Sequence, residues 1–220
     1  MASFGHIAIG MAAGRLHTRR GAPLRTLAPA MAGYALLSAL PDADIIGYFA
    51  GVPYDSTFGH RGAVHSLTFG VLSASAFCGI ARLLGQPLRR TAPLALVAAL
   101  SHPLLDTLTD GGHAIALLWP FSDARFFAPV RPIPVAPLSP AAWMSPWGAR
   151  VVAGELLLFG PLLAYALWPR FIRPRSRSRP RSRPRSQPRA PSPERRPASA
   201  PGAPRTPPPA PTSSRASGAG

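Results

Sequence analysis

Long apolar runs and short polar segments alternate over the first 170 residues of the chain. The apolar runs lie at 2–16, 26–40, 66–84, 91–109 and 151–168, with a shorter one at 113–121. Three of them approach the roughly 20 apolar residues that a helix needs to cross a bilayer. The first two are shorter, so we expect tilted or partial insertion for them. The pattern predicts an all-α fold: a multi-pass membrane helical bundle of about five segments.

The segment 128–147 interrupts this pattern with six prolines. Proline removes a backbone donor and clashes with the preceding helical turn, so this density predicts that no helix forms here. The segment is expected to lie over the surface or fold back at the membrane interface. Trp143 and Trp147 would anchor it there, because tryptophan favours that depth.

The composition changes abruptly after residue 170. Hydrophobic residues make up 47% of the chain and charged residues only 15%, but residues 171–220 consist largely of Arg, Ser, Pro and Ala. They carry 12 arginines and one acid, whereas residues 1–170 carry 12 arginines and seven acids. A segment with so little to bury is expected to be disordered. We therefore divide the chain into a membrane domain at 1–170 and a disordered tail at 171–220.

The arginine-rich tail would begin at a membrane surface, where anionic lipid head groups attract basic residues by about 1 kcal/mol each. We therefore expect membrane lipids, and anionic head groups in particular, as its partners. Nucleic acid would be bound only without sequence specificity, so no specific nucleic acid is expected. The oligomeric state is left open.

The distribution of arginine also predicts the topology. Because basic residues favour the cytoplasmic side, the tail and the loops around Arg19 and Arg89 are expected inside, with the N-terminus outside. This orientation in the cell (inner) membrane would bring every polar signature residue to the outer side. A site in the outer leaflet favours lipid or envelope-derived substrates.

His102 and Asp106 are the clearest candidate metal ligands. A spacing of four places both side chains on one helical face, about one turn apart. Histidine and carboxylate together are ligands that zinc prefers. The alternative is a polar pair that forms hydrogen bonds between helices.

His60 and His65 bracket a glycine-containing turn before the third helix. A spacing of five suits a junction between a loop and a helix, so one residue could bind metal while the other acts in proton transfer. His65 is nearer the membrane and is the predicted ligand. The alternative is a polar interfacial cap, with Ser66 capping the helix.

The remaining candidate residues of the metal site and its surroundings are Asp42, Asp44 and His6. The two aspartates follow Pro41 at the end of an apolar run, where they could instead cap a helix starting near Ile45. His6 could equally be a structural histidine. Beside the other signatures, we predict that a divalent metal ion, zinc by preference, is bound by His6, Asp42, His65, His102 and Asp106.

The remaining roles concern the reaction. A metal-activated water needs a group that accepts its proton, and Asp44 or His60 is predicted as this general base. Arg61 is predicted to bind an anionic group of the substrate. A salt bridge between Arg61 and Asp55, or an exposed position, is the alternative.

Taken together, these motifs resemble the YdjM-type family of inner-membrane, metal-dependent hydrolases over about residues 3–160. The matching segments are Gly5-His6, Leu40-Pro41-Asp42-Ala43-Asp44, His60 to Ser66, Ser101 to Asp106, Leu108-Thr109 and 117–121. The resemblance implies an inner-membrane protein with a metal site and hydrolase activity. The tail lies outside it.

Two classes of function follow. The first is a membrane hydrolase that uses a His/Asp-bound divalent metal to activate water. The second is a non-enzymatic membrane protein, either a metal or proton transporter or a scaffold with structural His and Asp residues. A transport path needs polar groups in both halves of the membrane, and the candidates lie in one half.

Overall fold

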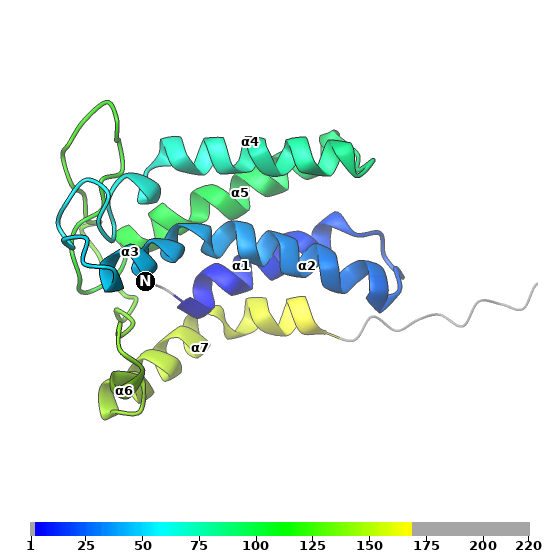
Figure 1. Ribbon diagram of the computed structural model, residues 1–220. Helices are drawn as coiled ribbons and strands as arrows, with labels where there is room; N and C mark the ends of the chain where they lie inside the picture. Colours follow the sequence, from blue (N-terminus) through cyan, green and yellow to red (C-terminus); the bar gives the residue numbers. More distant parts are fainter. Residues whose placement is uncertain (1–2, 169–220) are drawn as a thin grey trace, which may run out of the picture. The chain divides into compact units, whose positions relative to one another are not determined.

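The computed structural model describes residues 3–168, and these fold into helices joined by loops (Figure 1). No β-strand forms among them, only isolated bridges between Thr109 and Ile133 and between Ile115 and Phe126. The all-α class is therefore confirmed. The five long helices are α1 (Ser3–His17), α2 (Leu24–Ala39), α4 (Leu67–Leu83), α5 (Leu88–Thr107) and α7 (Pro146–Leu167).

Short helical turns occupy the connections: η1 (Leu40–Asp44), α3 (Ile45–Phe49), η2 (Ala63–His65) and α6 (Pro140–Trp143). The predicted absence of helix from 128–147 is wrong at two places, α6 and the start of α7. Pro140 and Pro146 occupy the first helical turn, where no backbone donor is needed, and Ser139 and Ser145 cap the two helices. The apolar run 113–121 forms no helix, because Ile115 pairs with Phe126 instead.

The long helices lie side by side, and the longest loops gather at one end of the bundle (Figure 1). α1 packs against α2, α5 and α7, while α4 packs mainly against α5. The core between them is built largely from alanine: Ala13, Ala74, Ala95, Ala98 and Ala99 surround Tyr34 and Leu37. Such small side chains let helix backbones approach closely.

The closest approach joins α1 and α2 through a Gly-x-x-x-Gly spacing. A Cβ atom on Gly10 would lie 2.4 Å from Cα of Ala35, and one on Gly14 would lie 2.5 Å from Cα of Met31. Both contacts are with backbone atoms, which cannot move away by a change of side-chain rotamer. This is the packing that small residues four apart provide between membrane helices.

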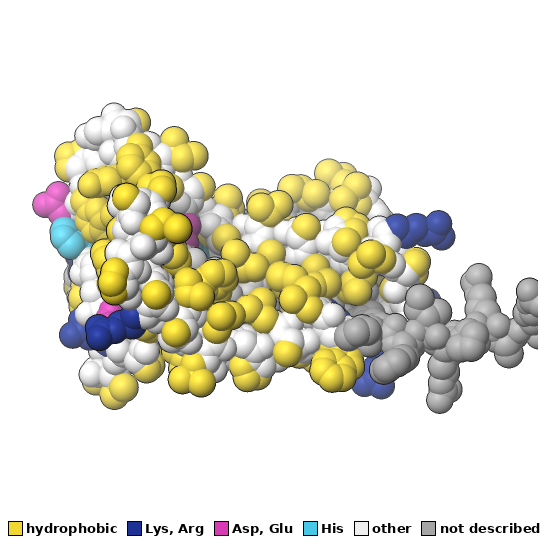
Figure 2. All heavy atoms as spheres, turned by 90° about the horizontal axis from the view of Figure 1, so that it is seen from below, with side chains coloured by type: hydrophobic (Ala, Val, Ile, Leu, Met, Phe, Trp, Pro, Cys, Tyr) yellow, Lys and Arg dark blue, Asp and Glu magenta, His cyan; other side chains and the backbone are white. Residues whose placement is uncertain are grey.

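Large apolar side chains cover the outside of the helices, and Figure 2 shows charged side chains gathered towards the two ends of the bundle. Leu72 and Leu83 of α4 are 62% and 88% exposed, and Leu157 of α7 is 82% exposed. By length and composition, α7 is the described helix that could cross a membrane, and α4 is a shorter apolar helix. The crossing of the membrane by all five segments stays a prediction. Residues 171–220, predicted as a disordered tail, lie outside the described residues.

Replacement of Gly10 by valine is expected to destabilise the fold by about 2 kcal/mol or more, because the added methyl groups would meet the α2 backbone. The matched control is Gly79→Val on α4, where an added Cβ meets no atom within 4 Å. Thermal unfolding of the two variants in detergent measures the difference. Equal midpoints would contradict the packing described here.

Candidate metal centre

The site begins with the anchoring of α1 by a buried carboxylate on α7. Glu155 is fully buried and accepts hydrogen bonds from the backbone N–H groups of Ser3, Phe4 and Gly5, at 3.1, 2.6 and 3.1 Å. These donors have no partner within α1, and a negative charge is favoured at a helix N-terminus. Glu155 therefore fixes the turn that carries His6. Sequence reasoning assigned it no role, although a lone acid in an apolar run was the available signal.

α5 supplies His102 and Asp106 on one face, as their spacing predicted. Nε2 of His102 lies 3.7 Å from Oδ2 of Asp106. Nδ1 of His102 is 2.7 Å from the carbonyl oxygen of Ser38, which can only accept, so Nδ1 donates and Nε2 is left to act as a ligand. The His6 ring stacks on the His102 ring at 3.8 Å, and its Nε2 lies 3.4 Å from Oδ1 of Asp106.

The turns η1 and η2 bring the next two residues to the same point. Oδ1 of Asp42 lies 3.5 Å from Nε2 of His65 and 3.5 Å from Nε2 of His102. Nε2 of His65 also lies 3.5 Å from Oδ2 of Asp106. Four side chains from three elements thus direct one atom each at a common centre: Asp42, His65, His102 and Asp106.

The spacing within this cluster suits a bound cation. Two ligand atoms on a tetrahedral zinc ion are about 3.3 Å apart, since each bond is about 2.0–2.1 Å long. Oδ1 of Asp42 and Nε2 of both His65 and His102 are buried and have no hydrogen-bond partner among the described residues. Buried polar atoms without such partners are costly unless something else satisfies them. The residues present therefore fit a divalent metal ion, with His6 beside it against Asp106.

The electrostatics agree with this fit. Burial alone would lower the pKa of His65, but the carboxylates of Asp42, Asp44 and Asp106 raise it to about 9. The carboxylates therefore favour positive charge at this position strongly enough to outweigh burial. A divalent cation supplies such charge more compactly than a protonated imidazole.

Asp44 and His60 form a separate pair at the edge of the cluster. Oδ1 of Asp44 lies 2.6 Å from Nδ1 of His60, and Oδ2 lies 3.2 Å from Nδ1 of His65. Burial would raise the pKa of Asp44, but hydrogen bonds to the two histidines hold it below its usual value. Asp44 is therefore ionised and accepts from His60, which leaves the buried Nε2 of His60 as an acceptor.

Asp44, His60 and His65 also converge closely enough to be considered as a second metal group. The distance between Asp44 and His60 argues against this interpretation. At 2.6 Å these atoms share a hydrogen bond, whereas two ligand atoms on one metal ion would lie farther apart. We therefore treat Asp44 and His60 as a hydrogen-bonded pair beside the cluster, and their role in proton transfer stays a prediction.

The structure distinguishes the two helix-capping alternatives, at Asp44 and at Ser66. Asp44 makes no side-chain cap to α3, although it stands at the N-cap position. Ser66 does cap α4, accepting from the N–H of Phe69 at 3.0 Å. The cap at Ser66 coexists with the cluster, because it involves neither His60 nor His65.

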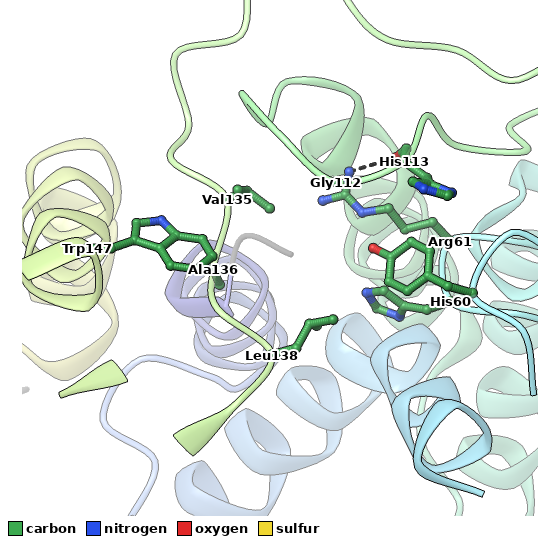
Figure 3. A pocket seen from close by; sticks show the side chains of 9 residues that line it. His60, Arg61, Gly112, His113, Val135, Ala136, Leu138 and Trp147 are labelled. Atoms are coloured by element: carbon green, nitrogen blue, oxygen red, sulfur yellow. Dashed lines mark hydrogen bonds between the residues drawn. The ribbon is translucent and has the colours of Figure 1, made fainter. Parts of the chain in front are cut away.

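A pocket of about 270 Å³ opens beside the Asp44–His60 pair (Figure 3). His60, Arg61 and Tyr54 line it with His113, while Val135, Ala136, Leu138 and Trp147 line it from the loop before α7 and from α7 itself. The Tyr54 ring packs edge-on against the rings of His60 and His113, at 5.2 and 4.6 Å. Sequence reasoning missed Tyr54 and gave His113 no role.

Arg61 lies at the wall of this pocket and is fully buried. Nη1 donates to the carbonyl oxygens of Gly111 and His113, and Nη2 donates to Oγ1 of Thr109. The alternatives of an exposed side chain or a bridge to Asp55 are therefore wrong. The loop 109–113 holds the guanidinium group because three acceptors converge on it.

Comparison with known proteins identifies a family of inner membrane proteins. The chain matches the YdjM inner membrane protein family over residues 1–174. It belongs to this family. The inner membrane protein YbcI of Escherichia coli (strain K12) is 43% identical over 140 residues, which cover 61% of this chain and 80% of that protein. No solved structure is significantly similar. Membership of the family supports the predicted location in the inner membrane.

Removal of two ligands is expected to abolish metal binding. The detergent-purified wild type should hold about one zinc ion per chain, and the double variant His102→Ala plus Asp106→Ala should hold almost none, because it loses two of four ligands. Elemental analysis measures both. His113→Ala, at the pocket wall, is the matched control and should keep its metal. Equal, substoichiometric metal in wild type and double variant would contradict the assignment.

Proposed function

We propose that this protein is a membrane-bound, metal-dependent hydrolase. One observation carries the proposal: a buried set of metal-ligand atoms lies next to an oriented acid/base pair that borders a pocket. A structural metal site would need no such pair. Membership of an inner membrane family is consistent with the proposal but names no reaction.

Asp42, His65, His102 and Asp106 would hold the metal ion, with His6 as a further ligand or a support for Asp106. A bound zinc ion lowers the pKa of its water towards neutrality and polarises a substrate oxygen. The protein's own contribution is proton transfer. Nε2 of His60 accepts the proton of the attacking water, and the Asp44 carboxylate stabilises the resulting imidazolium through Nδ1. His60 can then return the proton to the leaving group.

Transport or a scaffold role is the alternative. A transport path would require polar side chains along the whole bundle. Ionisable groups at the opposite end form local structural contacts instead: Nη1 of Arg15 donates to the carbonyl oxygen of Ala166, and His17 lies within hydrogen-bond distance of Tyr34 and Gln86. Between these ends the core is alanine-rich, and the one-sided arrangement favours an enzyme.

Loss of His60 is expected to separate catalysis from metal binding. In His60→Gln, turnover should fall by about 100-fold or more, because general-base assistance is lost, while the metal content stays the same. The assay uses chromogenic p-nitrophenyl acyl esters and phosphodiesters with the zinc-loaded protein. His17→Gln, a histidine substitution at the opposite end of the bundle, serves as the control and should keep its activity. Full activity in His60→Gln would contradict the proposed base.

We also propose that all five long helices cross the membrane, with the metal centre towards the outside and the tail in the cytoplasm. A cysteine introduced at Ser139, exposed before α6, should then react with an impermeant thiol reagent added to spheroplasts. A cysteine at Gln86, exposed between α4 and α5, should react only after the membrane is opened. Both are made in a Cys78→Ala background. The reverse labelling would place the site on the cytoplasmic side.

A further inference from the structure

The pocket beside the Asp44–His60 pair has two chemically different walls. Figure 3 shows His60, Arg61 and His113 on one side, and Val135, Ala136, Leu138 and Trp147 on the other. Its volume of about 270 Å³ equals that of about nine water molecules at ~30 Å³ each. This is enough for a small polar group and a short length of hydrocarbon chain.

The polar wall contains a cationic donor that none of the described residues satisfies. The hydrogen bonds of Arg61 use Nη1 twice and Nη2 once. Nε is buried and has no hydrogen-bond partner within residues 3–168. A buried charged donor without a partner is costly, so an acceptor supplied from the pocket would be favoured.

The backbone of Gly112 lies directly against the guanidinium group of Arg61. It lines the pocket with a φ of +80°, a conformation that glycine adopts readily. A Cβ atom at this position would lie 3.0 Å from both Cζ and Nη1 of Arg61. Any side chain here would therefore press on the cation from the pocket side.

The charge of the lining favours an anion. Among the residues that line the pocket, one is arginine, two are histidine and none is acidic. The Asp44 carboxylate is engaged by Nδ1 of His60 and is not among the residues that line the pocket. The apolar wall favours hydrocarbon, and Trp147, which is 46% exposed, lies at this wall.

We propose that this pocket binds an anionic amphiphile, with the charged head group against Arg61 and His60 and the proximal alkyl or acyl chain against Val135, Leu138 and Trp147. A longer chain would leave the pocket past Trp147 into the surrounding lipid, so a membrane lipid with an anionic head group is the ligand class. The proposal rests on the proposed hydrolase in that it names the substrate class. Binding itself requires no turnover.

Calorimetric titration of the detergent-solubilised, zinc-loaded protein with hexyl phosphate tests this. Hexyl phosphate should bind about tenfold or more tightly than inorganic phosphate, which lacks the chain, and than hexyl glucoside, which lacks the charge. Leu138→Asp should weaken hexyl phosphate binding about tenfold, because it places a negative charge in the pocket, while the isosteric Leu138→Asn should change it far less. Metal content is measured in every variant and should not change.

Equal binding of hexyl phosphate and hexyl glucoside, or equal effects of Leu138→Asp and Leu138→Asn, would overturn the proposal. If hexyl phosphate binds as expected but incubation with zinc leaves no metal on the protein, the hydrolase proposal fails while the pocket assignment stands. If metal is bound but hexyl phosphate, inorganic phosphate and hexyl glucoside bind equally well, the pocket assignment fails while the hydrolase proposal stands. Repetition of the titration in nanodiscs tests whether the anionic ligand comes from the bilayer. Phosphatidylglycerol should compete with hexyl phosphate, and phosphatidylcholine should not. Equal titrations in the two lipids would exclude bilayer lipid as the ligand.

Discussion

The burial of ionisable groups at one end of an otherwise apolar bundle is the constraint on which the rest of the structure depends. His6, His60, Arg61, His65, His102, Asp106 and Glu155 are each at most 1% exposed. Removal of such groups from water is costly unless each one is paired, hydrogen-bonded or bound to an ion. The turns η1 and η2, the first turn of α1 and the loop 109–113 all converge here, because each supplies a partner that another element needs.

Two of these groups act as structural anchors, each in a different way. Glu155 fixes the start of α1 by accepting three backbone N–H groups, and Arg61 fixes the loop 109–113 by donating to it. Neither anchor is a member of the cluster that could bind a metal ion. Their arrangement holds His6 and the pocket wall in place without contributing a ligand to the centre. The alanine and glycine contacts between helices supply the close packing that these anchors require.

His60 connects the buried centre to the pocket. Its Nδ1 is engaged by Asp44, which also approaches His65, and its ring lines the pocket wall. A change of protonation at His60 would therefore alter the charge both next to Asp44 and at the pocket wall. The proposed hydrolysis uses this connection, because Nε2 of His60 would take the proton of the attacking water while the same ring lines the pocket in which the substrate would bind.

Much of this organisation can be read from the sequence. The long apolar runs predicted the five main helices to within a few residues, because the positions of apolar residues and prolines act locally. The four-residue spacing of His102 and Asp106 placed them on one helical face for the same reason. The order of the polar motifs was sufficient to indicate the family, which the comparison confirmed.

Only contacts between distant segments could decide how the individual polar side chains are used. Glu155 gained its role from the N-terminus of α1, about 150 residues away. Arg61 became buried because the loop 109–113 offers acceptors, and Tyr54 joined the pocket because His60 and His113 flank it. Likewise, the Ser38 carbonyl orients His102, and the Asp44 carboxylate engages Nδ1 of His60. Local pattern thus determined which residues are polar and on which helix they lie, whereas tertiary contact decided which atom of each faces the candidate metal centre, the pocket or the backbone.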